Sequence, residues 1–190
     1  MTVAAPTATS AGPRASLLRR LAALAYEMLL LASIFLVAGF ALAPLVSTGA
    51  APAGGRIPIL GAPERTLLFA GLFGVGALYC GWSWSGGRRT LPMKTWRMHL
   101  TRRDGGNLDG RTALLRYFAV WIGPALALAG YVALQHTGAA RAALLLLGVN
   151  YLWAAVNRDR QFLHDALAGT RLVADAPAGA ARGDAPCGDR

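Results

Sequence analysis

The stretch "LAALAYEMLLLASIFLVAGFALAPLV", Leu21–Val46, contains one charged residue, Glu27, among its twenty-six residues. A helix that crosses a membrane needs about 20 mostly apolar residues, because the hydrocarbon core is about 30 Å thick. The stretch therefore predicts a transmembrane helix. Three further apolar runs follow, at Leu67–Trp84, Ala113–Leu134 and Ala139–Val156. We expect an all-α membrane protein with four spans, the last of which is the shortest and needs Arg141 to reach one membrane surface.

The composition and charge fit the same class. The chain has 190 residues, of which 55% are hydrophobic, and a net charge of +10. Its mean hydropathy, +0.42, is high for a soluble domain. The basic residues lie between apolar runs and not on a soluble domain, which disfavours nucleic acid as a partner.

The placement of the basic residues predicts the orientation of the chain. Most Lys and Arg lie before the first span, between the second and third spans, and after the fourth. The positive-inside rule then places both termini and the middle loop in the cytoplasm, where the loop can contact anionic lipids. Arg19-Arg20 before an apolar run that includes "ALA" at 41–43 also suggests a cleavable signal. The length of the run and Glu27 within it argue against that alternative.

Outside the spans the chain varies in character. Residues 1–15 and 174–190 are rich in small and polar residues, so we expect disordered tails around a membrane domain of residues 16–173. In the middle loop, Trp96, Met98 and Leu100 alternate with polar residues before an Asp-Gly-Gly-Asn turn signal. This pattern predicts a short strand or β-hairpin on the cytoplasmic membrane surface, and "GTRLVAD" (169–175) offers a further strand. An extended interfacial loop is the alternative.

Glu27 is the clearest anomaly within the spans. At helical rise it lies roughly 9 Å into the first apolar run, where an ionisable group needs a partner, water or a proton. Arg20 is on the same helix face, but its side chain leans toward the headgroups. Arg116 enters the third span at a similar depth and is the better predicted partner. Glu27 is then either an ion or proton site, or half of a structural clamp between two helices.

The stretch "DRQFLHDALAGT", Asp159–Thr170, contains a His-Asp pair, His164 and Asp165. Residues 157–168 fit a short amphipathic helix in which both side chains lie away from the apolar centre, as solvated or capping residues. No nucleophile or set of three or four converging ligands accompanies them. We therefore predict no catalytic residue, no metal site and no cofactor. Cys80 and Cys187 suggest neither a disulfide nor a metal pair.

At these residues the chain resembles the RDD family of bacterial multi-pass membrane proteins, named for one Arg and two Asp positions. Arg20 with "LAALAYEMLLL" resembles the amino-terminal block, "GGRRTLPMKTWRMHL" the loop after the second span, and "GRTALLRYFA" the start of the third. "NRDRQFLHDALAGTRLV" resembles the carboxy-terminal block, with Asp165 as the second Asp. Two residues depart from the pattern: Glu27 replaces Asp, and Pro92 replaces Gly.

The resemblance implies a bacterial inner-membrane protein suspected of transport, in some members cation/proton exchange. Carried onto this chain, Arg20, Glu27 and Asp165 form a charged cluster on the cytoplasmic side, to which we add Arg116 and His164. We expect transport of a cation or small solute coupled to protons, through a homo-oligomer because four short helices enclose little space. A non-transporting scaffold or accessory subunit is the alternative, and an enzyme is the least favoured class.

Overall fold

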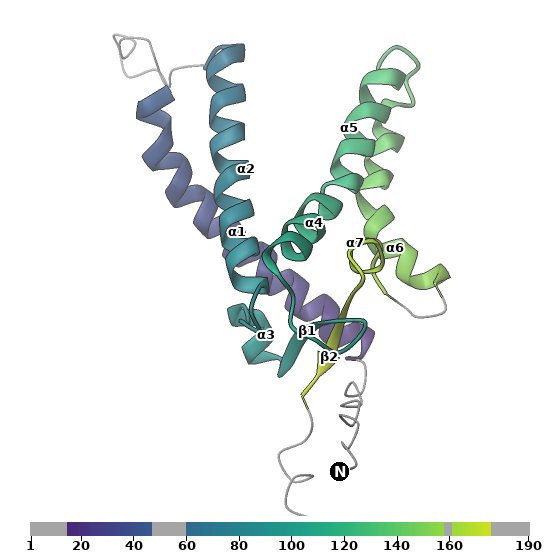
Figure 1. Ribbon diagram of the computed structural model, residues 1–190. Coiled ribbons are helices and arrows are strands. Elements are labelled where there is room, and N and C mark those ends of the chain that lie inside the picture. Colours follow the sequence, from purple (N-terminus) through teal and green to yellow (C-terminus); the bar gives the residue numbers. More distant parts are fainter. Residues whose placement is uncertain (1–14, 47–59, 158–160, 176–190) are drawn as a thin grey trace, which may run out of the picture.

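The computed structural model describes residues 15–46, 60–157 and 161–175, and Figure 1 shows how their elements are arranged. In chain order they are α1 (Leu17–Val46), α2 (Ala62–Trp84), α3 (Leu91–Thr95), β1 (Met98–Arg102), α4 (Gly110–Val120), α5 (Ile122–Leu134), the 3-10 helix η1 (Ala140–Gly148), α6 (Val149–Val156), α7 (Leu163–Leu167) and β2 (Thr170–Ala174). Helices α1 and α2 form one arm, and α5 with η1 forms a second arm that diverges from the first (Figure 1). The short elements α3, β1, β2 and α7 lie at the base where the arms meet.

Three helical segments are long and apolar enough to cross a membrane: Leu17–Val46, Ala62–Trp84 and Gly110–Leu134, the last being α4 and α5 together. The first two begin a few residues earlier than predicted, because the helix continues past the apolar run into its polar flank. The fourth predicted segment, Ala140–Val156, is a shorter apolar helix. The predicted helical membrane architecture is thus confirmed as far as three candidate spans.

The third predicted span is interrupted where its sequence contains Pro124. Proline has no backbone N–H, so the carbonyl of Val120, four residues earlier, lacks its helical donor. The helix breaks at Trp121, between α4 and α5. The side chain of Asn150 in α6 replaces the missing donor, with its Nδ2 2.8 Å from the Val120 oxygen.

Close packing in the second arm depends on glycine. A Cβ at Gly123 would lie 3.0 Å from the backbone oxygen of Leu147 and 3.2 Å from that of Leu146. These oxygens belong to η1, whose backbone has little room to move away. Gly123 therefore lets α5 approach η1 directly.

The two strands pair with each other across a long stretch of sequence. β1 and β2 are antiparallel, with Leu100 opposite Leu172 and Met98 opposite Ala174. The middle-loop strand and the further strand in "GTRLVAD" are therefore both present, but they form one sheet and not a local hairpin. Pro92 is accommodated in the first turn of α3, which Thr90 caps.

The sheet also extends the folded region beyond its predicted end. Ala174 lies in β2, and the Asp175 carboxylate is 2.7 Å from both Arg89 Nη1 and His99 Nδ1. The prediction that disorder begins at residue 174 is wrong for these two residues, and the prediction of disorder through residue 15 is wrong for Ala15, which is 5% exposed in the core. The remaining predicted disorder, at 1–14 and 176–190, lies outside the described residues, as does Cys187.

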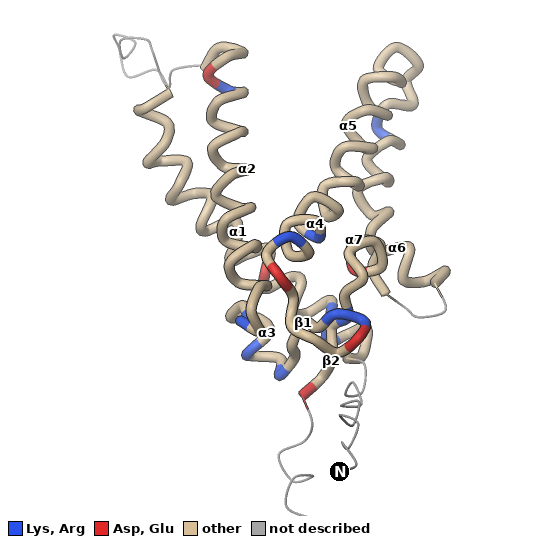
Figure 2. Tube along the Cα trace, in the orientation of Figure 1, with Lys and Arg blue, Asp and Glu red and all other residues tan. Residues whose placement is uncertain are grey.

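Charged residues gather at one end of the molecule. Most Lys and Arg of the described ranges lie around α3, the sheet and the start of α4, while the far ends of the two arms carry few charges (Figure 2). Many large apolar side chains along the arms are exposed, including Leu36, Phe40 and Leu145. A charged base with apolar arms fits a membrane protein better than a soluble one.

Candidate functional site

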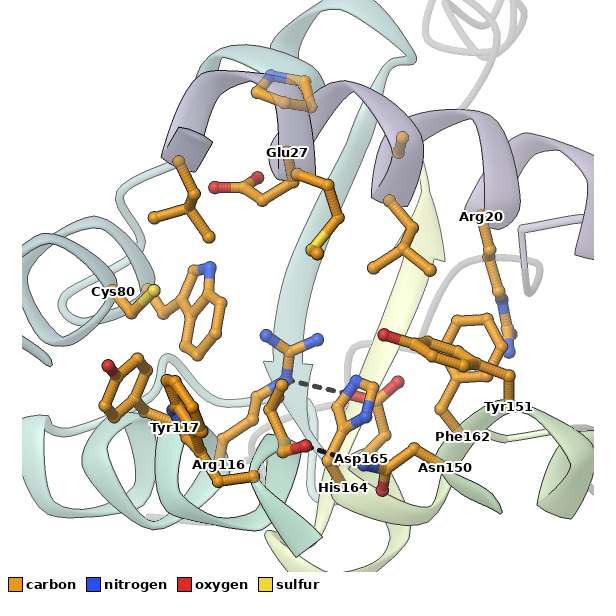
Figure 3. A pocket seen from close by; sticks show the side chains of 18 of the residues that line it. Arg20, Glu27, Cys80, Arg116, Tyr117, Asn150, Tyr151, Phe162, His164 and Asp165 are labelled. Atoms are coloured by element: carbon orange, nitrogen blue, oxygen red, sulfur yellow. Dashed lines mark hydrogen bonds and ion pairs between the residues drawn. The ribbon is translucent and has the colours of Figure 1, made fainter. Parts of the chain in front are cut away.

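A cavity of about 500 Å³ lies where the two arms meet the base. Figure 3 shows its lining seen from close by. Elements α1, α2, α4, α6 and α7 all contribute side chains, most of them apolar. All five residues singled out from the sequence line this one cavity: Arg20, Glu27, Arg116, His164 and Asp165.

Arg116 and Asp165 form a buried ion pair between α4 and α7. Arg116 Nε donates to Asp165 Oδ1 at 2.8 Å, and the two residues are 7% and 1% exposed. The Thr170 hydroxyl lies 3.3 Å from the same oxygen. The Arg116 guanidinium also stacks over Trp84, with Cζ 4.2 Å from the ring centroid. The predicted pairing of Arg116 with Glu27 is therefore wrong, because Asp165 takes the Nε–H bond and α7 brings it closer.

The environment of Asp165 keeps it ionised. Burial by itself raises the pKa of this carboxyl, but the charge and hydrogen bond of Arg116, helped by the neighbouring His164 and Arg20, outweigh burial and lower it. The interpretation of Asp165 as a solvated or capping residue is wrong, since the side chain is enclosed. Asp165 is one half of an ion pair that fixes α7 against α4.

His164 is buried beside this pair but is not a dyad partner of Asp165. Its Nε2 lies 3.7 Å from Asp165 Oδ1, which is beyond hydrogen-bond distance. The ring stacks on Phe162, with centroids 5.6 Å apart, and meets Tyr151 edge to face. Burial lowers the pKa of His164 to about 4, with a smaller opposing effect from Asp165. The histidine is therefore neutral at neutral pH.

The predicted helix around these residues is shorter than expected. α7 covers only Leu163–Leu167, and α6 ends at Val156. Gly169 follows with a φ of 65°, a left-handed conformation that glycine adopts readily. After this turn the chain enters β2 at Thr170. The short segment from α7 to β2 therefore positions both Asp165 and Thr170, whose hydroxyl contacts the Asp165 carboxylate.

Glu27 has a different kind of partner. Its Oε1 accepts a hydrogen bond from the Tyr79 hydroxyl of α2 at 3.1 Å, and the Thr90 side chain approaches the same carboxylate. The residue is only partly buried, and its carboxylate projects from α1 toward the cavity (Figure 3). In the described part of the chain, no arginine forms an ion pair with Glu27.

Arg20 is more enclosed than the sequence suggested. Its side chain was predicted to lean away from Glu27 toward the headgroups, and the residue is 4% exposed and lines the cavity from α1. Figure 3 shows it at the opposite end of the cavity wall from Glu27. It contributes to the low pKa of Asp165 through its charge.

Three residues of the site were missed by the sequence argument: Tyr79, Trp84 and Asn150. Tyr79 and Trp84 read as ordinary interfacial or packing aromatics. Asn150 carried a usable signal, because a proline within an apolar helix leaves a carbonyl that needs a polar donor. No three His, Cys, Asp or Glu side chains gather as metal ligands within the ranges 15–46, 60–157 and 161–175.

Comparison with known proteins bears on the family of this chain. Neither the curated proteins nor the solved structures give a match. The model of the RDD family matches residues 14–169, which covers both arms, the cavity and the Arg116–Asp165 pair. Because this match spans most of the sequence, the chain belongs to the RDD family.

Proposed function

We propose that this protein is a four-span protein of the bacterial inner membrane that moves a cation or small solute coupled to protons, with Glu27 as the carrier. The observation that supports the proposal is the contrast between the two acids of the cavity. Asp165 is held by Arg116, whereas Glu27 is bound by a neutral hydroxyl and faces the cavity. An acid inside a span without a bound cation can exchange a proton or bind a cation from the cavity.

The fourth span is part of the proposal. η1 has nine residues and α6 has eight. At rises of about 2.0 Å and 1.5 Å per residue they reach roughly 30 Å, the thickness of the hydrocarbon core. The 3-10 segment thus compensates for the short sequence.

The distribution of charged residues is the basis for the proposed orientation of the chain in the membrane and for its proposed lipid contacts. Lys and Arg gather at the base of the molecule, which we place in the cytoplasm with both termini and against anionic lipid headgroups. We propose no nucleic-acid partner, and a homo-oligomer as the conducting unit because four short helices enclose little space. We also propose no enzymatic role, because His164 and Asp165 are used in packing and ion pairing.

The alternative is a membrane scaffold or accessory subunit that transports nothing. The Arg116–Asp165 pair favours it, because a purely structural role explains that pair completely. The two proposals differ on Glu27, which a scaffold does not need in ionised form.

The experiment is proton and cation flux in proteoliposomes that contain the full chain. We expect pH-coupled flux with the wild type, loss of flux with Glu27→Gln, and wild-type flux with Glu64→Gln, a matched change that lies outside the cavity. Wild-type proteoliposomes without flux for a broad set of cations, driven by ion or pH gradients, would exclude transport and leave the scaffold.

A further inference from the structure

The cavity wall contains buried polar atoms that lack a partner. Trp84 Nε1, Asn150 Oδ1 and His164 Nδ1 have no hydrogen bond within the described residues, and all three residues line the cavity. Asn150 and His164 are 1% and 4% exposed. Buried polar atoms are normally satisfied, since an unmade hydrogen bond after desolvation is costly. These atoms are enclosed by neighbouring side chains, so the polar group that a ligand in the cavity meets is the Glu27 carboxylate, which projects toward it (Figure 3).

The rest of the wall favours an apolar body for that molecule. Phe35, Trp121 and Tyr151 line the cavity together with leucine, alanine and methionine side chains. The volume of about 500 Å³ falls in the range of small-molecule sites, which are mostly apolar with a few placed polar groups. A wall of this composition offers aromatic and apolar contacts to most of the ligand surface.

The charge of the cavity selects the polar end of the ligand. Arg116 is balanced by Asp165, and Arg20 lies at the far end of the wall from Glu27 (Figure 3). Glu27 is thus the acid that can accept a positive group, and nearby aromatic faces also attract cations. A bare metal cation is a poor match, because hard cations require about six or more oxygen ligands. In the described ranges no group of three or more acidic, His or Cys side chains gathers to hold one.

We propose that the cavity binds an amphipathic organic ammonium ion, with its N–H groups on Glu27 and its apolar body against the aromatic wall. The proposal rests on the proposed transport function and names the substrate class of the same cavity.

The test compares two probes of nearly equal shape, 2-(1-naphthyl)ethylamine and the neutral 2-(1-naphthyl)ethanol. Binding of each to the full chain in lipid nanodiscs is measured by calorimetry, with empty nanodiscs subtracted. We expect the wild type to bind the amine at least about tenfold more tightly than the alcohol, since one charge pair is gained. Glu27→Gln should remove that preference and leave alcohol binding unchanged, while Glu64→Gln should keep it.

A second variant guards against a trivial loss of fold. Glu27→Asp keeps a carboxylate at the same position of α1 and shortens the side chain by one methylene group, so the amine preference should persist. Equal affinity of the wild type for amine and alcohol overturns the inference, as does an unchanged amine preference in Glu27→Gln. Flux of Na⁺ or protons without amine binding overturns the inference but leaves the proposed function intact. If neither flux nor amine binding is observed, the proposed transport function and the inferred ligand class are both wrong.

Discussion

Two acids line the same cavity, yet they sit in opposite electrostatic situations. Asp165, on α7, is 1% exposed and receives the Nε–H of Arg116 at 2.8 Å. Glu27, on α1, is partly buried, and within the described residues its hydrogen-bond partners are the neutral side chains of Tyr79, at 3.1 Å, and Thr90. An acid that is paired with arginine is held in its charged form, whereas an acid with neutral partners can gain or lose a proton at lower cost. The comparison therefore separates a structural acid from one suited to exchange.

The largest effect should come from breaking the structural pair. Asp165→Asn leaves the Arg116 guanidinium buried without its counter-charge, and removal of one partner of a buried pair costs about 3–5 kcal/mol. We expect SDS-induced unfolding of the protein in mixed micelles to show a loss of this size. The double variant Arg116→Met with Asp165→Leu should recover most of it, because neither charge then remains. A loss below about 1 kcal/mol for Asp165→Asn would contradict the structural assignment.

A second prediction concerns how the free energy of unfolding depends on pH. The folded protein keeps His164 neutral, with a pKa of about 4, whereas the unfolded chain protonates it below its ordinary pKa of 6.5. The unfolded state then binds more protons, so the free energy of unfolding should fall as the pH drops from about 6.5 to 4, by at most about 3 kcal/mol. Asp165 adds its own loss at lower pH, because its folded pKa is also lowered.

The measurement is the free energy of unfolding across this pH range for three proteins. His164→Gln should flatten the decline between pH 6.5 and 4, since the replacement does not titrate. His136→Gln removes an exposed histidine and should leave the wild-type slope in place. An equal slope in the wild type and in His164→Gln would show that His164 is not held neutral.

A third prediction concerns Asn150, which lies in the wall of the same cavity. Asn150→Leu removes the donor to the Val120 carbonyl, and an unsatisfied buried carbonyl costs about 1–3 kcal/mol. Pro124→Ala in the same chain supplies a backbone N–H four residues after Val120, so the cost of Asn150→Leu should shrink in that background. A double-mutant cycle by SDS-induced unfolding measures this coupling. Strictly additive effects would mean that Asn150 stabilises the arm in some other way.

These sites show where sequence reasoning holds and where it stops. Apolar runs are local features, so the ends of α1, α2 and the Gly110–Leu134 segment could be predicted to within a few residues. The depth of Glu27 and Arg116 along the membrane normal was also available from helical rise. Depth does not give direction around the helix axis, and Arg116 points toward α7 and not toward α1.

The partner of a side chain or strand that lies far along the chain was the harder problem. Asp165 is forty-nine residues from Arg116, and β2 pairs with β1 only because the chain returns to the base after α6. The sequence "RMHLTRR" contains no local feature that favours pairing with β2. A hairpin across the Asp104–Asn107 turn was equally compatible with it. From the sequence, the prediction that Arg20, Glu27 and Asp165 form one cluster came only from the family resemblance.

The smallest stability effect should come from the other acid. Glu27→Gln keeps an acceptor oxygen for the Tyr79 hydroxyl and removes a charge that no arginine binds in the described ranges. We expect its free energy of unfolding to stay within about 1 kcal/mol of the wild type, because a neutral hydrogen bond replaces a charged one of modest strength. SDS-induced unfolding of Glu27→Gln beside Asp165→Asn compares the two acids directly. A loss for Glu27→Gln as large as that for Asp165→Asn would make both acids structural and remove the basis for assigning exchange to Glu27.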